Sequence, residues 1–179
     1  MSCRGRDVVD GEGTDRVLLR LSGNRARLRQ ARQDDCKLLW NWANEPTVRA
    51  ASFSTEPIPW DDHAAWFTSR LGNPGCLTYV GLDENDVPIG QVRFDVEHDE
   101  AEISVSVASE HRGKGYGSLL IHLGAAEVFR QTSCLEVHAF IKPNNDGSIR
   151  AFEKSGFRSM GTATVRNCKA LHYVRDKTP

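Results

Sequence analysis

The chain has 179 residues, 39% hydrophobic and 26% charged, which is typical of one compact globular domain with a short appendage. Its 23 basic and 24 acidic residues give a formal net charge of -1, which excludes a general attraction to nucleic acid or to an anionic membrane. No stretch approaches eighteen apolar residues, and the N-terminus lacks the apolar core of a signal peptide, so we expect a cytoplasmic protein. The five cysteines lack the close spacing of metal or redox sites, so we expect reduced thiols and no metal.

The apolar pattern separates an N-terminal tail, residues 1–24, from a domain at 25–179. Within the domain it predicts strands and helices in the order βααβββαβαββ. The strands are expected at 26–31, 76–82, 88–96, 101–107, 134–141, 157–161 and 169–176. The helices are expected at 36–44, ending before Pro46, and at 58–71, 118–131 and 144–156. Short polar connectors favour an antiparallel meander for the three middle strands, so the expected class is mixed α/β.

The stretch S-E-H-R-G-K-G-Y-G-S, residues 109–118, places three glycines in five positions where a strand ends and an apolar helix begins. Amides at such a junction have no partner within the helix, and the helix dipole adds positive charge, so the junction can bind an anion. The glycines would let a diphosphate approach these amides, and Arg112 and Lys114 would add charge. A glycine-rich turn without a ligand is the alternative.

The spacing of the glycines separates three kinds of phosphate loop. A P-loop requires G-x-x-x-x-G-K-[ST], and the stretch contains no such frame. A dinucleotide fingerprint, G-x-G-x-x-G, would start at Gly113 and Gly115 but meets Ser118 at its last position, and it would follow an antiparallel meander. The pattern R-x-x-G-x-G does fit, with Arg112, Gly115 and Gly117.

In this pattern the sequence resembles the GNAT superfamily of acetyl-CoA-dependent N-acetyltransferases, whose pyrophosphate-binding signature is Q/R-x-x-G-x-G/A. The block N-N-D-G-S-I-R-A-F-E-K-S-G-F, residues 144–157, resembles that family's N-x-x-[AS]-x-x-x-[YF]-x-K-x-G-F block. The residues in register are Asn145, Ser148, Phe152, Lys154, Gly156 and Phe157. The resemblance covers about residues 25–175 and implies a mostly antiparallel sheet of six to seven strands, about four flanking helices and a splayed strand pair that holds acetyl-CoA.

The resemblance also implies where acetyl-CoA, the co-substrate, would bind. Val105 and Val107, on the strand before the loop, would pair with the pantetheine arm, and Asn145 would reach the pantetheine or the thioester region. The pyrophosphate would lie on the amides of Arg112, Gly113, Lys114, Gly115, Tyr116, Gly117 and Ser118. The residues expected near the CoA arm or the nucleotide are Ser148, Phe152 and Lys154.

The implied reaction is direct attack of an amine on the thioester, which requires deprotonation of an ammonium and stabilisation of an oxyanion. An amine of pKa about 10.4 is neutral about once in two thousand at pH 7, a cost of about 4.6 kcal/mol, so a base is useful. By analogy with family members Glu102 is the best-placed base, His138 could relay the proton, and Asn145 is the third catalytic candidate. A solvent-facing glutamate and a packed histidine are the alternatives for the first two.

Phe152 departs from the family pattern. Many members have a tyrosine at this position, and its hydroxyl is credited with protonating the leaving thiolate. Phenylalanine has no proton to give. Either Tyr116, Ser148 or a water takes the role, or the thiolate leaves unassisted.

Acceptor choice in the family lies in the first two helices and the loop between them, here residues 42–67. The candidate substrate residues there are Arg49, Ser54 and His63, among tryptophans that are more typical of a core. This stretch resembles the branch that acetylates the 4-amino group of UDP-linked amino-dideoxy sugars, on the route to pseudaminic acid. In the tail, V-D-G-E-G-T-D-R-V resembles the C-terminal end of a nucleotide-sugar hydrolase of that route, as if a remnant of a fused upstream domain.

The expected partner is therefore a small-molecule amine, a nucleotide-linked amino sugar, without nucleic acid or membrane, and a homodimer is compatible with the resemblance. Two alternatives remain open. One is a RimJ/RimL-like acetyltransferase of protein N-termini, and the other is a non-catalytic acetyl-CoA-binding module.

Overall fold

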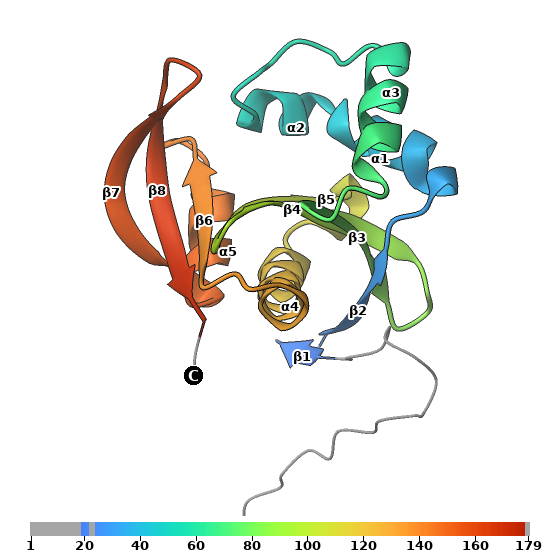
Figure 1. The fold of residues 1–179 in the computed structure, drawn as a ribbon. Coiled ribbons are helices and arrows are strands. Elements are labelled where there is room, and N and C mark those ends of the chain that lie inside the picture. The colour runs from blue at the N-terminus through green and yellow to red at the C-terminus, as the bar shows by residue number, and fades with distance from the viewer. Residues whose placement is uncertain (1–18, 22–23, 178–179) are drawn as a thin grey trace, which may run out of the picture.

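The computed structural model describes residues 19–21 and 24–177. These residues form an eight-stranded mixed sheet in the order β1-β2-β3-β4-β5-β6-β8-β7, with α4 and α1–α3 on opposite sides of its central strands (Figure 1). The strands are β1 (Leu19–Leu21), β2 (Asn24–Gln30), β3 (Cys76–Asp83), β4 (Pro88–Glu97), β5 (Glu100–Val107), β6 (Glu136–Ile141), β7 (Arg158–Val165) and β8 (Cys168–Asp176). The helices are α1 (Cys36–Ala43), α2 (Pro46–Ala51), α3 (Trp60–Arg70), α4 (Tyr116–Gln131) and α5 (Asp146–Lys154), with 3-10 turns η1 (Gln33–Asp35) and η2 (Ser109–His111).

The predicted mixed α/β class and element order are confirmed, with two additions. The sequence predicts that a helix ends before Pro46, but Pro46 also begins a further helix, α2. Proline is accepted there because the first amides of a helix have no partner in any case. The second addition is β1, which lies in the predicted tail and pairs with β2, Leu19 facing Ala26. The rest of the proposed tail, including its resemblance to a hydrolase, lies outside the described residues.

Helix α4 packs closely on β4, which fixes where its N-terminus lies. A Cβ atom added at Gly124 would stand 2.9 Å from a methyl carbon of Val92 and 3.1 Å from the ring of Phe94. The helix backbone therefore lies directly on the side chains of Val92 and Phe94 at this point, and Leu119 and Leu120 on the same helix are fully buried. Residues Leu39, Trp42 and Phe67 form part of a second core under α1 and α3. No helix of the described residues is long and apolar enough to cross a bilayer.

The pairing of β5 with β6 is short. These two are the parallel neighbours among the described strands, and they pair only from Glu100 with Glu136 to Glu102 with His138. Strand β5 continues to Val107 while staying paired with β4 on its other side. Beyond Glu102 the strands therefore separate, as the resemblance implied for a splayed pair.

Candidate active site

The glycine stretch leads from the open end of the strand split into α4. Gly113 and Gly115 have φ angles of 73° and 87°, which place both in the left-handed region that favours glycine. Gly115 is the N-cap of α4, a helix of 16 residues, so the first-turn amides face outward at the positive end of a long dipole. This geometry suits a bound diphosphate, as the sequence predicted.

Arg112 is placed differently from its expected role beside the pyrophosphate. Its Nε donates to the carbonyl oxygen of Val107 at 2.9 Å, and its guanidinium also bonds to the hydroxyl of Thr47 at 2.6 Å and to the carboxylate of Glu45. The charge is thus paired with Glu45, and the side chain joins the loop to the start of α2. Lys114 is exposed in the loop, and its carbonyl accepts a hydrogen bond from the side chain of Asn24.

The second motif begins α5 close to the glycine loop. The side-chain oxygen of Asn145 caps this helix by accepting from the amide of Ser148 at 3.2 Å. A Cβ atom added at Gly117 would lie 3.7 Å from that of Ala151 on α5 and 3.8 Å from Val107 on β5. Both motifs and the separated part of β5, where Val105 and Val107 are half-buried, therefore converge on one place.

The remaining expected cofactor residues differ in exposure. Phe152 is 4% exposed and packs edge-to-face on Phe157 with ring centroids 5.0 Å apart, so its ring belongs to the core. Lys154 is exposed and lines a cavity of about 570 Å³ whose wall also carries Arg158, Arg175, Lys177 and Asp176, which is paired with Arg158. The excess of basic residues on this wall suits phosphate groups.

A second cavity, about 460 Å³, opens on the other face of the sheet where β5 and β6 part. The described residues that line it include four carboxylates and no lysine or arginine; they are Asn73, Gly75, Cys76, Asp95, Val96, Glu97, Glu100, Ala101, Glu102, His138 and Phe140. We call this space the acceptor cavity. Burial, and then the nearby Asp95 carboxylate, raise the pKa of Glu102, which makes it a stronger base than an ordinary carboxylate. Glu102 and His138 face each other as the last pair before the split.

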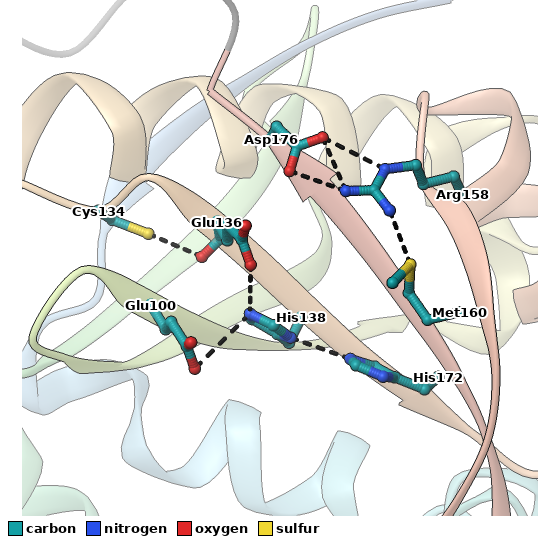
Figure 2. Close-up of polar contacts among 8 residues, drawn as sticks. All are labelled: Glu100, Cys134, Glu136, His138, Arg158, Met160, His172 and Asp176. Carbon is teal, nitrogen blue, oxygen red and sulfur yellow. Dashed lines mark hydrogen bonds and ion pairs between the residues drawn. The ribbon is translucent and has the colours of Figure 1, made fainter.

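His138 is part of a polar cluster that the sequence did not indicate (Figure 2). Its Nδ1 lies 2.9 Å from Nε2 of His172 on β8, and its Nε2 lies 3.4 Å from a carboxylate oxygen of Glu136 and 3.7 Å from one of Glu100. Burial and the neighbouring His138 lower the pKa of His172. His172 was missed because only the pairing of β6 with β8 brings these positions together.

The side chains of two of the three predicted substrate residues make contacts within the helical region. His63 is 3% exposed, and its ring donates from Nε2 to the carbonyl of Cys36 at 3.1 Å, holding α3 on α1. Arg49 donates to the carbonyls of Ala43 and Ser54 at 2.6 and 3.1 Å. Arg49 therefore shapes the connection between helices, while the side chain of Ser54 stays exposed.

Comparison with known families decides the class of protein. Residues 25–158 match the acetyltransferase (GNAT) domain family. The chain belongs to this family. It is accordingly an acetyl-CoA-dependent N-acetyltransferase, with acetyl-CoA as its co-substrate.

Individual relatives of this GNAT protein are distant. It is 29% identical over 119 residues to the phosphinothricin acetyltransferase YwnH of Bacillus subtilis. This alignment covers 63% of this chain and 71% of the relative. It is 22% identical over 172 residues to the Klebsiella pneumoniae aminoglycoside N(6')-acetyltransferase type 1, covering 87% and 85%. The solved spermidine N-acetyltransferase of Vibrio cholerae, in complex with CoA and spermine, superposes with a TM-score of 0.76 at 20% identity and covers 84% and 95%. This last likeness supports the fold.

Proposed function

We propose that this protein acetylates a small cationic primary amine, which attacks acetyl-CoA directly at the point where β5 and β6 part. One observation carries the proposal. The strand split has the glycine loop and α5 at one side and the acidic acceptor cavity at the other. A thioester threaded through the split would meet an amine bound in that cavity.

The residues divide into the roles that this reaction requires. The amides from Arg112 to Ser118 would hold the pyrophosphate, and Val105 and Val107 would pair with the pantetheine arm through their backbone. Glu102 and His138 are the candidate bases, while Asn145, which caps α5, would lie near the thioester. Preorganised groups of this kind lower the barrier chiefly by position and charge.

The acid that protonates the leaving thiolate is the least supported role. Phe152 has no hydroxyl, and burial together with Asp83 and Glu84 raises the pKa of Tyr116, which weakens it as an acid. The amide of Ser148 donates to the side chain of Asn145, and no described residue makes a hydrogen bond to the Ser148 hydroxyl. Since a thiol of pKa about 8.5 gives a good leaving group near neutral pH, we propose that the thiolate leaves unassisted or is protonated by water.

The charge of the acceptor cavity favours a cationic acceptor. Asp95 is paired with Arg70, but Glu97, Glu100 and Glu102 also line the cavity, and carboxylates attract an ammonium and repel a diphosphate. Aminoglycosides and spermine, named for two of the similar proteins, are amines of this kind. A nucleotide-linked amino sugar remains the second candidate, supported by the resemblance of residues 42–67, and a protein N-terminus is the third. A cytoplasmic location is part of the proposal, because acetyl-CoA must be supplied.

The test is the rate of CoA release with a panel of acceptors: spermidine, an aminoglycoside, a UDP-linked 4-amino sugar and a short peptide. We expect spermidine or the aminoglycoside to accelerate release most. If the UDP-linked sugar is preferred, the cationic assignment is wrong. If no amine accelerates release although acetyl-CoA stabilises the protein, by about 2.7 kcal/mol at one hundred times its Kd, the proposed transfer fails.

A further inference from the structure

Three hydrogen-bond acceptors converge beside the acceptor cavity. Nε2 of His138 and one carboxylate oxygen each of Glu100 and Glu136 all lie within 4.8 Å of one another (Figure 2). The His138 side chain is 16% exposed, its Nε2 is shielded from solvent, and no described residue makes a hydrogen bond to that atom. Acceptors gathered in this way repel one another unless a donor of positive charge lies among them.

His172 is the hydrogen-bond partner of Nδ1 of His138. A proton lies between Nδ1 of His138 and Nε2 of His172, 2.9 Å apart. When His138 donates it, the Nε2 lone pair points at Glu100 and Glu136. Phe140 stacks on the His172 ring at 4.8 Å and 16°, which limits rotation of the ring. The pair thus orients His138 in the way that the partner of a ligating histidine does.

A primary ammonium can bond to all three acceptors, because it has three N–H donors. With hydrogen bonds of about 2.8 Å its acceptors stand about 4.6 Å apart, so the exposed carboxylates, which lie 3.4 and 3.7 Å from Nε2, would turn outward to admit it. A zinc ion, with bonds of about 2.0 Å, would place its ligands about 3.3 Å apart, close to the present distances, so the metal content of the protein distinguishes the two ligands. The carboxylates of Glu100 and Glu136 are 63% and 45% exposed, which leaves room for a substrate to enter.

We propose that Glu100, Glu136 and His138 form the seat of the acceptor's primary ammonium, that Nε2 of His138 takes a proton from it, and that His172 is a positioning residue. This inference rests on the proposed function. The deprotonated nitrogen attacks the acetyl carbon, a C–N bond forms and the C–S bond breaks. The nitrogen loses a second proton, so that of the two protons one ends on the CoA thiol and one is released to solvent.

The seat is tested by steady-state kinetics with spermidine as the probe. Glu100→Gln and Glu136→Gln should each raise KM for spermidine about fivefold or more, with KM for acetyl-CoA unchanged, because each removes one charged acceptor. His138→Gln should lower kcat about 100-fold, the size of a lost general base. Asp34→Asn, which neutralises an exposed carboxylate in η1, is the matched control for charge.

His172 is tested by a pair of variants. His172→Phe should lower kcat about tenfold with little change in KM for spermidine, since the ring remains but the hydrogen bond to His138 is lost. His172→Gln should restore most of kcat, because its side-chain oxygen can accept the same proton. If His172 serves packing alone, His172→Phe should keep a higher kcat than His172→Gln, because phenylalanine is the better match for a stacked ring.

Two outcomes overturn the seat. In the first, Glu100→Gln and Glu136→Gln show the same KM for spermidine as Asp34→Asn, so neither carboxylate binds the amine. In the second, the purified protein contains stoichiometric zinc and Glu136→Gln loses it, so the cluster is a metal site. If spermidine does not accelerate CoA release, calorimetric titration of spermidine separates the two proposals. Binding that Glu136→Gln weakens supports the seat although the transfer fails, and absent binding ends both.

Discussion

The α4 side of the sheet and the α1–α3 side are held by different means. Around α4 the backbone sets the geometry, through positive φ at Gly113 and Gly115 and the close contact at Gly124. Around α1–α3 side chains hold the backbone, as Arg49 does with several carbonyls and the indole of Trp40 does by donating to Ile58 at 2.8 Å. Geometry set by backbone leaves a spaced motif in the sequence, whereas side-chain networks of this kind leave none.

The largest effect is expected where a side-chain network starts α1. Asp35 binds the guanidinium of Arg29 through two bonds of 2.7 Å and accepts from the amide of Arg32, and its side chain is 9% exposed. Asp35→Ala should lower the free energy of unfolding by about 3 kcal/mol, since it removes one member of a mostly buried ion pair. Urea titration measures the free energy of unfolding. A loss below 1 kcal/mol would contradict the view that side-chain networks hold the α1–α3 side of the sheet.

The second largest effect is expected at Gly115, where backbone geometry rather than a side-chain network sets the structure. Gly115→Ala should cost about 1–2 kcal/mol of stability for its left-handed φ and raise KM for acetyl-CoA about tenfold or more, because the methyl group lies at the amides of the loop. Gly161→Ala is the matched control, with φ 101° in β7. It should lose similar stability and keep its KM for acetyl-CoA. If both variants change KM for acetyl-CoA equally, the glycine loop is not part of the acetyl-CoA site.

The smallest effect concerns His63 and pH. Burial lowers the pKa of His63, and Arg93 lowers it further, while the hydrogen bond to Cys36 raises it, so the folded protein binds a proton at this ring less readily than the unfolded chain does. The unfolded chain binds a proton near pH 6.5, so this contribution to stability is complete above that pH and is lost as the pH falls below it. Between pH 7 and 5.5, His63→Phe should flatten the pH dependence of the free energy of unfolding, by at most about 1 kcal/mol. His122 and His172, whose pKa burial also lowers, and Glu102, whose pKa burial raises, contribute to the slope that remains. An unchanged slope would contradict the lowered pKa of His63.

The same contrast explains how much could be predicted from the sequence. Strand and helix order could be predicted from apolar periodicity, and the proposed anion site was inferred from the glycines and the block at Asn145, because each depends on residues close together in the chain. The His138–His172 pair spans 34 residues and depends on strand register, which no local pattern encodes. His63 looked like a polar exception in an apolar stretch, but its role is to satisfy a buried carbonyl of another helix.

Arg112 belongs to both sides at once. Its guanidinium connects the carbonyl at the end of β5 with Thr47 and Glu45 at the start of α2. A ligand that fixes the glycine loop therefore also restrains the helices beside the proposed amine site, and the protein then loses less conformational entropy when the amine binds. If acetyl-CoA binds at the loop as proposed, we therefore expect positive cooperativity between the two substrates, seen as a lower KM for the amine at saturating acetyl-CoA.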